Sequence, residues 1–372
     1  MDETQWQQAG LYDPAAPNAA DRLALLRYLE EQGCDLEELV EAEARDRLFA
    51  LAGDRILRPS RPRYDAAQAA ALLGTDAATV SRAWRSFGLP APVEPVLGEQ
   101  DLAALRTWLL VKDLLGADAA TALGRVLGSG MSRLAEATSA TMRGDDSGLG
   151  QNMDRGRSGS EVVTAQVYAE ASMLVPQIGN VLDAVHRHHL EAARRHFELV
   201  APTPDRVRCG IGFADLCDFT AMSSAMPMDA LSKMLSEFED LATDTVNELG
   251  GRVVKFMGDA VMYVAPTAPM LASLSCALVS HPEAEAAGLK ARAGIAYGDL
   301  LAQDGDYFGP PVNLASRLVA IAAPGEILAA PSVVPLLDGS HIAIEREAQA
   351  IRGLAEPVTP YAIVSAPGRS GG

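Results

Sequence analysis

The chain has 372 residues, a length that predicts two domains or three rather than a single core. Its apolar fraction of 48% is typical of a globular protein, and its formal net charge of -18 disfavours binding to nucleic acid or anionic lipid. The negative charge does not exclude an anionic nucleotide, because bound metal ions and a few well-placed cations dominate locally.

Nothing in the sequence indicates a membrane or secreted protein. No stretch approaches the ~18 uninterrupted apolar residues of a membrane span, and the N-terminus lacks the basic patch and apolar run of a secretory signal. Four cysteines are scattered without CxxC spacing, which disfavours a zinc site or a disulfide scaffold. We therefore expect a cytoplasmic protein.

The N-terminal part shows helical periodicity. After a flexible N-terminus over residues 1–19, leucines recur at three- and four-residue spacing and predict an all-α domain over residues 20–142. Within it, residues 64–90 resemble a helix-turn-helix unit with Gly74 in the turn. A DNA reader needs a basic face, whereas the charges of this segment cancel, so DNA is an unlikely partner.

A linker and a long helix follow. Residues 143–160 are rich in Gly, Ser and Asp and predict a linker. Residues 161–200 predict a connecting helix with a kink at Pro176 or Gly179.

The connecting helix carries four of the six histidines, beside three arginines. These regulatory candidates are His186, His188, His189 and His196. One interpretation is a solvated basic helix face. The other is a pH switch, because imidazole titrates near pH ~6.5 and positive charge would then accumulate on this segment.

Strands and helices alternate in the C-terminal part. The order strand-helix-strand-strand-helix-strand over residues 205–365 predicts a ferredoxin-like α/β sandwich, so the whole chain falls in the α+β class. Residues 366–372 are expected to form a flexible tail. In such a sheet the end of the first strand, at Asp215, lies beside the turn between the next two strands, at Asp259. Each Asp alone would more simply cap a turn, but two converging carboxylates suit two hard divalent cations.

Three segments of this part resemble known catalytic motifs. Residues 213–220 (FADLCDFT), 254–261 (VKFMGDAV) and 306–317 (DYFGPPVNLASR) are similar, in this order, to the motifs of class III nucleotidyl cyclases. The resemblance extends roughly from Asp205 to Val364. It implies that Asp215 and Asp259 bind two Mg²⁺ or Mn²⁺ ions per active site.

The resemblance also implies that Lys255 and Asp306 read the purine. An ammonium donates a hydrogen bond to adenine N1, and a carboxylate accepts one from the exocyclic amine. Guanine presents a donor at N1 and an acceptor at O6, so the same pair would be mismatched there. The expected activity is therefore that of an adenylyl cyclase, which converts ATP to cyclic AMP and pyrophosphate.

The remaining site residues follow from the same motifs. Asn313 and Arg317, four residues apart on one helix face, match the family's transition-state pair. Asn313 would orient the ribose, and Arg317 would stabilise charge on the phosphoryl group. The turn at Phe219 and Thr220, and Arg352 in the last loop, match phosphate contacts.

One position departs from the family pattern, because Asp218 stands where Gly is usual in the turn after the first metal Asp. An extra carboxylate there would repel ATP, or would point outward. A catalytically weak nucleotide-binding module is therefore the alternative function, ahead of a DNA-binding regulator that uses residues 64–90.

Two further expectations concern assembly and control. In the family, the metal pair comes from one subunit and the other two pairs from its partner, which implies a homodimer. The arrangement of helical domain, connecting helix and catalytic domain resembles that of soluble actinobacterial adenylyl cyclases. It implies that the N-terminal domain regulates the activity.

Overall fold

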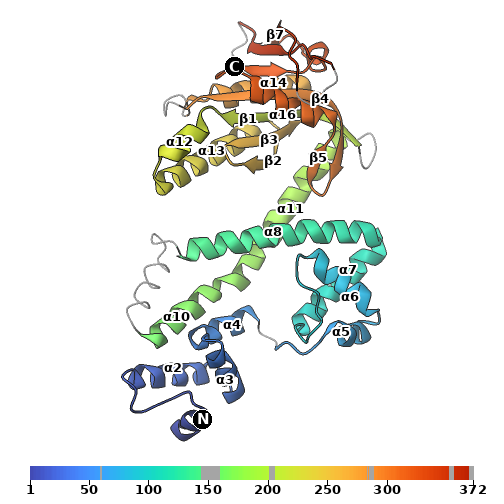
Figure 1. Cartoon of the computed structure of the whole chain (residues 1–372). Helices are drawn as coiled ribbons and strands as arrows, with labels where there is room; N and C mark the ends of the chain where they lie inside the picture. Colours follow the sequence, from blue (N-terminus) through green and yellow to red (C-terminus); the bar gives the residue numbers. More distant parts are fainter. Residues whose placement is uncertain are drawn as a thin grey trace. The chain divides into compact units, whose positions relative to one another are not determined.

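A computed structural model describes residues 1–58, 61–143, 160–200, 206–282, 284, 289–351 and 356–367. The chain forms two compact units, Met1–His188 and His189–Gly372. Helix α11 (Leu174–Val200) begins in the first unit and ends in the second (Figure 1). Among the described residues, no helix is both long enough and apolar enough to cross a membrane.

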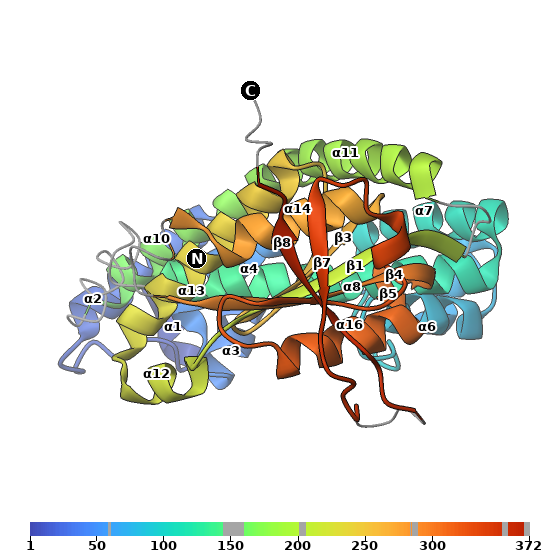
Figure 2. The ribbon, with the colours of Figure 1, turned by 90° about the horizontal axis from the view of Figure 1, so that it is seen from above.

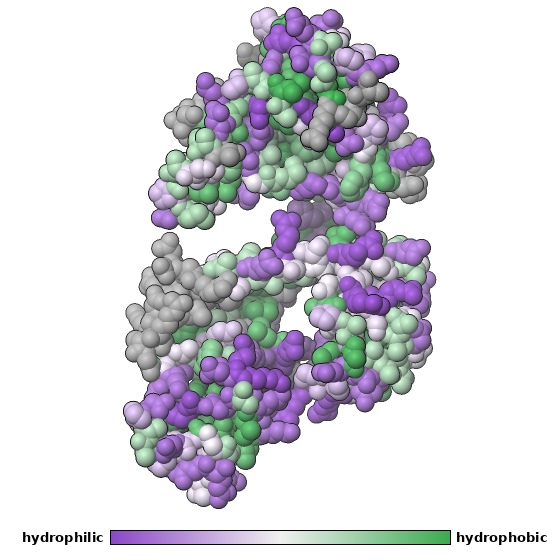
Figure 3. All heavy atoms as spheres, viewed as in Figure 1, coloured by the Kyte–Doolittle hydropathy of each residue, from purple (hydrophilic) through white to green (hydrophobic). Residues whose placement is uncertain are grey.

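The first unit is helical, as predicted. Its helices are α1 (Glu3–Gln8), α2 (Ala19–Glu31), α3 (Leu36–Ala44), the 3₁₀ turn η1 (Leu48–Ala50), α4 (Leu51–Leu57), α5 (Ala66–Leu73), α6 (Ala77–Ser86), α7 (Glu99–Leu115), α8 (Ala117–Arg143) and α10 (Glu161–Ser172). One hydrophobic core lies among α1 to α4 and α10, around Leu26 and Leu39, and a second among α5 to α8, around Val80 and Leu105. The visible face of this unit carries hydrophilic and hydrophobic residues side by side (Figure 3).

Two N-terminal expectations are corrected by the structure. Residues 1–19 are not wholly flexible, because they contain α1, whose Trp6 is 2% exposed and packs in the first core. The connecting helix is interrupted at Met173, between α10 and α11, and not at Pro176 or Gly179. Pro176 is the third residue of α11, where a missing N–H removes no intrahelical hydrogen bond. Residues 144–159 of the expected linker lie outside the described residues.

The second unit contains the expected α/β sandwich. Its elements are β1 (Arg206–Leu216), α12 (Phe219–Ala225), α13 (Met228–Glu248), β2 (Arg252–Met257), β3 (Ala260–Ala265), α14 (Ala268–Val279), β4 (Ala291–Gln303), β5 (Asp306–Phe308), α16 (Pro310–Ile321), β6 (Ile327–Ala329), η2 (Val334–Leu336), β7 (His341–Glu345) and β8 (Tyr361–Ser365). The strand order is β2-β3-β1-β4-β6-β8-β7, and β5 pairs with β4. The first four strands have the antiparallel order of a ferredoxin-like sheet, so the predicted fold is confirmed.

Helices cover both faces of this sheet (Figure 2). Helices α13 and α14 pack on one face, and α16 packs on the other together with Val200 at the end of α11. Because both faces are covered, β1 is buried along most of its length. Helix α16 approaches β4 closely at Gly294, where a Cβ would lie 2.3 Å from the backbone oxygen of Ala315. This glycine therefore helps to place α16.

Candidate active site

The two predicted metal-binding aspartates lie side by side. Asp215, the penultimate residue of β1, pairs in register with Ala260, and the Leu216 N–H donates to the Asp259 backbone oxygen at 3.2 Å. Gly258 allows the tight turn before Asp259, since it has a φ of 67°. The two carboxyl groups are close enough to share a hydrogen bond. The convergence expected from the strand order is thus present in the structure.

An arginine that sequence reasoning missed accompanies this pair. Arg292 on β4 lies opposite Asp215 in the sheet register and forms an ion pair with its carboxylate at 2.9 Å. The same guanidinium donates to the backbone oxygens of Ala320 and Ala322, at the end of α16. Arg292 therefore links the first carboxylate to the helix that carries Asn313 and Arg317. A charged residue within the apolar run 291–297 was the only sequence signal for it.

The electrostatics of the pair favour a cation. Burial raises the pKa of the Asp259 carboxyl, and the negative charge of Asp215 raises it further. A divalent cation would relieve this repulsion. The described residues contain no group of three or more His, Cys, Asp or Glu side chains that would hold a metal. Two carboxylates with substrate phosphates as the other ligands match the usual binding of Mg²⁺, so the residues fit the expected ions.

The predicted purine-reading pair is also brought together. Lys255 lies on β2 and Asp306 begins β5, and their side chains form an ion pair. The side chain of Lys255 is 39% exposed and that of Asp306 is 25% exposed, so both remain accessible to a ligand. Strand β2 is at the edge of the sheet. In the strand order, β3, β1 and β4 lie between β2 and β5. The contact is thus made by side chains of two strands that do not pair with each other.

Helix α16 presents the third predicted pair on its outer side. Its Ala315, Leu318 and Val319 are buried toward the sheet, whereas Asn313 is exposed and Arg317 is partly exposed. The four-residue spacing places Asn313 and Arg317 on the same side of the helix. They are therefore accessible to a substrate or to another subunit.

The turn after β1 accommodates the unusual Asp218. This residue adopts φ 60° and ψ 16°, a left-handed conformation that Gly favours and that Asp tolerates better than most residues. Its side chain is exposed and makes no capping hydrogen bond to α12. Phe219 and Thr220 begin α12, whose first N–H groups lack intrahelical acceptors. Asp218 thus preserves the backbone of the turn. Arg352 lies outside the described residues.

The four histidines of α11 differ in their surroundings. His186, His188 and His189 are exposed. The neighbouring basic charge is partly compensated within the helix, because Arg187 pairs with Asp183 and Arg195 with Glu191, both at 2.9 Å.

His196 is the exception, at 7% exposure. Burial, and secondarily the charge of Arg252, lowers its pKa to about 4. The expectation that all four histidines gain charge near pH ~6.5 is therefore wrong for His196, since a buried imidazole avoids the charged form.

The depressed pKa of His196 predicts a pH dependence of stability. Below pH ~6.5 the unfolded chain protonates this histidine, whereas the folded chain does so only near pH 4. Acidification from pH 7 to 5 is thus expected to lower the free energy of unfolding by ~1–2 kcal/mol through this group. Urea denaturation at pH 5, 6 and 7 should show a smaller pH slope for His196→Gln and an unchanged slope for the exposed control His189→Gln. Equal slopes for His196→Gln and wild type would contradict the prediction.

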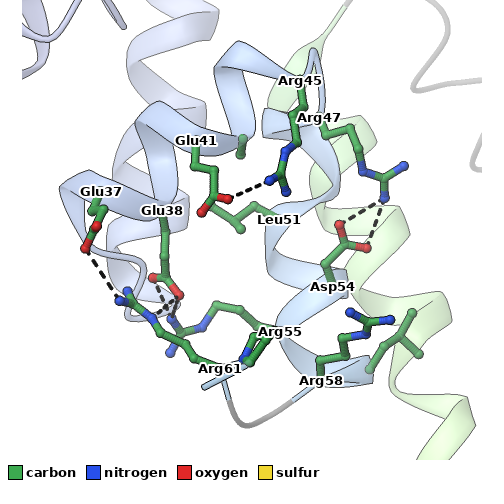
Figure 4. A pocket seen from close by; sticks show the side chains of 13 residues that line it. Glu37, Glu38, Glu41, Arg45, Arg47, Leu51, Asp54, Arg55, Arg58 and Arg61 are labelled. Carbon is green, nitrogen blue, oxygen red and sulfur yellow. Dashed lines mark hydrogen bonds and ion pairs between the residues drawn. The ribbon is translucent and has the colours of Figure 1, made fainter. Parts of the chain in front are cut away.

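A hollow with strongly charged walls lies elsewhere, in the first unit. This cavity of about 650 Å³ is lined by five arginines and four acidic residues of the region from α3 to the residues after α4 (Figure 4). Each acidic residue has an arginine partner, as for Glu38 with Arg55 at 2.7 Å and Asp54 with Arg47 at 2.9 Å. This network ties α3 to α4 and contains none of the predicted catalytic residues.

Comparisons with known proteins identify both units. Residues 202–365 match the adenylate and guanylate cyclase catalytic domain, and residues 5–194 match the adenylate cyclase regulatory domain. An uncharacterized protein of Mycobacterium tuberculosis is 48% identical over 323 residues, covering 86% of this chain and 84% of that protein. An adenylate cyclase of Streptomyces coelicolor is 32% identical over 285 residues, covering 75% of this chain and 73% of that protein.

A "pH-sensitive adenylate cyclase" of Mycobacterium tuberculosis is 29% identical over 321 residues, covering 84% of this chain and 79% of that protein. Among solved structures, the adenylyl cyclase CyaB from P. aeruginosa is 27% identical, with a TM-score of 0.41, and the match covers 45% of this chain and 98% of that chain. The two matching domains and the 32% identical adenylate cyclase of Streptomyces coelicolor show that this chain belongs to the class III nucleotidyl cyclases with an N-terminal adenylate cyclase regulatory domain.

Proposed function

We propose that this chain converts ATP to 3′,5′-cyclic AMP and pyrophosphate. The observation that carries the proposal is the ion pair of Lys255 with Asp306, whose donor and acceptor match the Watson–Crick edge of adenine. The name of the Streptomyces coelicolor relative, adenylate cyclase, agrees with this base choice. The left-handed backbone of the turn at Asp218 and the exposure of its side chain support an active enzyme over the alternative, a catalytically weak module.

The reaction requires in-line displacement at the α-phosphorus. The ribose 3′ hydroxyl gives its proton to water and its oxygen bonds to this phosphorus, while the bond from the phosphorus to the bridging oxygen breaks and pyrophosphate leaves. Two Mg²⁺ or Mn²⁺ ions, held by Asp215 and Asp259, would stabilise the negative charge of the attacking and leaving oxygens. Asn313 orients the ribose, and Arg317 stabilises the charge that builds on the phosphoryl oxygens. The N–H groups of Phe219 and Thr220, with Arg352, bind the other phosphates.

A symmetric homodimer is part of the proposal. Asn313 and Arg317 lie on an outward-facing side of α16, as expected for groups that serve a site shared with a second subunit. The metal pair of one subunit would then act with the purine pair and the Asn313–Arg317 pair of its partner. Two complete sites result from two identical chains.

The direct experiment incubates the purified chain with ATP or GTP and either Mg²⁺ or Mn²⁺, and separates the products by chromatography. Cyclic AMP from ATP, with little cyclic GMP from GTP, is the expected result. A chain that binds ATP but forms no cyclic nucleotide would instead be a nucleotide-binding module.

Exchanging the polarity of the purine pair is expected to alter base choice. In the double variant Lys255→Glu, Asp306→Cys, the position facing N1 becomes an acceptor and the carboxylate facing the amine is lost, so both match adenine poorly. The value of kcat/KM for ATP should fall by about 10²–10³-fold, and the preference for ATP over GTP should narrow. Parallel assays with both nucleotides measure this. If the double variant keeps the wild-type preference for ATP over GTP, the purine is recognised by other residues.

We further propose that the N-terminal unit restrains the catalytic unit through α11 and that acidification weakens the restraint. Only His186, His188 and His189 remain as exposed candidates for the pH response. A shortened chain for the test should begin at His189, because His196 and Val200 pack within the second unit. The rate of cyclic AMP formation by both chains should be compared from pH 5.5 to 8. Equal rates would refute the restraint, and parallel pH–rate profiles would refute the pH response.

A further inference from the structure

The end of α11 makes a buried polar contact with the catalytic unit. His196 Nε2 lies 3.4 Å from the hydroxyl oxygen of Tyr307, a residue that is only 2% exposed. Arg252 Nη2 donates to the same hydroxyl at 2.7 Å, and its guanidinium lies over the tyrosine ring, 5.3 Å from the centroid. Three side chains from α11, β5 and β2 thus meet at one hydroxyl group.

One hydrogen-bond direction within this cluster is fixed by chemistry. A guanidinium only donates, so the tyrosine oxygen accepts from Arg252. The tyrosine proton is then free to be donated to His196 Nε2, which is an acceptor in the neutral tautomer that carries its proton on Nδ1. Burial and the nearby arginine keep His196 neutral, which makes this arrangement consistent.

The cluster lies on the same two strands as the purine pair. Tyr307 follows Asp306 directly on β5, and Arg252 precedes Lys255 by three residues on β2. The Tyr307 N–H also donates to the Asp306 carboxylate at 2.8 Å, which orients that side chain. Strands β5 and β2 do not pair with each other, so these side-chain contacts, Arg252 with Tyr307 and Lys255 with Asp306, connect them.

We propose that His196 is a positioning residue for purine recognition, which holds Tyr307 against Arg252 and thereby keeps Asp306 in place opposite Lys255. The inference rests on the proposed function, since it takes Lys255 and Asp306 as the purine-reading pair. It adds a contact by which the end of α11 acts on base recognition. Movement or unwinding of this last helical turn would loosen β5 and weaken nucleotide binding.

Removal of the histidine from the full-length chain tests this. His196→Ala and Tyr307→Phe are each expected to raise the KM for ATP by about 5- to 20-fold at pH 7.5, with a smaller change in kcat, and to narrow the ratio of kcat/KM for ATP over GTP. His196→Gln, which retains a hydrogen-bond acceptor, should restore most of the wild-type KM. The matched control is His189→Ala, an exposed histidine of the same helix, which should resemble wild type.

A merely structural role would give a different pattern. A fall in kcat with unchanged KM and unchanged base preference in both His196→Ala and Tyr307→Phe would overturn the proposal. The proposal would also be overturned if the effects of His196→Ala and Tyr307→Phe on the KM for ATP were additive in the double variant. Two residues that act through one hydrogen bond should instead show coupled effects. Thermal melting confirms that each variant is folded, and His196→Gln and Tyr307→Phe keep the test decisive if His196→Ala unfolds.

The test also separates this inference from the proposed function. If Lys255→Glu, Asp306→Cys changes base choice but the His196 and Tyr307 variants do not, the inference fails and the purine assignment stands. Equilibrium binding of a non-hydrolysable ATP analogue gives a readout without turnover. Unchanged affinity in His196→Ala refutes the inference even if the wild-type chain proves catalytically inactive.

Discussion

Replacing Asp215 or Asp259 by Asn is expected to reduce cyclic AMP formation by at least about 10³-fold. Each substitution preserves the size of the side chain but removes a negatively charged ligand from the site where the two carboxyl groups converge. Without it, the charge on the attacking and leaving oxygens is not compensated. Initial rates over a range of Mg²⁺ and Mn²⁺ concentrations measure the effect, and excess metal is not expected to rescue it.

The substitution Asp259→Asn should increase the stability of the protein although it decreases the activity. Its pKa is raised by burial and by Asp215, so the charged form is disfavoured in the folded metal-free protein. Asp259→Asn is therefore expected to raise the Tm slightly, by ~1–3 °C in chelator, while abolishing turnover. Asp240→Asn, at an exposed position of α13, is the matched control and should leave both properties unchanged. Near-wild-type rates in both Asp215→Asn and Asp259→Asn would refute the metal assignment.

The convergence of these aspartates was predictable because it depends on strand order alone. The pattern of strands and helices indicated a ferredoxin-like sheet, and such a sheet places the end of β1 beside the β2–β3 turn. Arg292 was not predictable in the same way. Its contact with Asp215 depends on the register between β1 and β4, which are 75 residues or more apart in the chain. Periodicity alone does not give that register.

The helical parts show the same limit. Spacing of leucines indicated the cores of the first unit, but α1 has six residues, too short for a periodic signal, and its Trp6 was missed. Along α11 four histidines look alike in sequence. Only packing against β5 and β2 distinguishes His196 from His186, His188 and His189. Whether a histidine is buried in a contact or exposed to solvent depends on tertiary packing. The sequence alone therefore did not distinguish the four histidines.

Two inactive chains are expected to complement each other when mixed. Asp215→Ala disables the metal pair and Arg317→Ala disables the transition-state pair, so each homodimer alone should retain less than about 1% of the wild-type rate. If the active site is shared between subunits, a heterodimer has one site that carries both lesions and one that carries neither. Random mixing of equal amounts makes about half of the dimers heterodimers, so the mixture should regain about a quarter of the wild-type activity.

The matched control mixes Asp215→Ala with Asp259→Ala. Both substitutions affect the same metal pair, which forms within one chain, so every site of that heterodimer contains at least one lesion. No recovery is expected there. The measurement is the rate of cyclic AMP formation after unfolding and refolding the mixed chains, with differently tagged chains co-purified to demonstrate heterodimers. Absence of recovery from Asp215→Ala with Arg317→Ala, despite such heterodimers, would mean that each subunit holds its own complete site. Because Asp215 and Arg317 would serve one site from different subunits, whereas Asp215 and Asp259 converge within one chain, we expect recovery only in the first mixture.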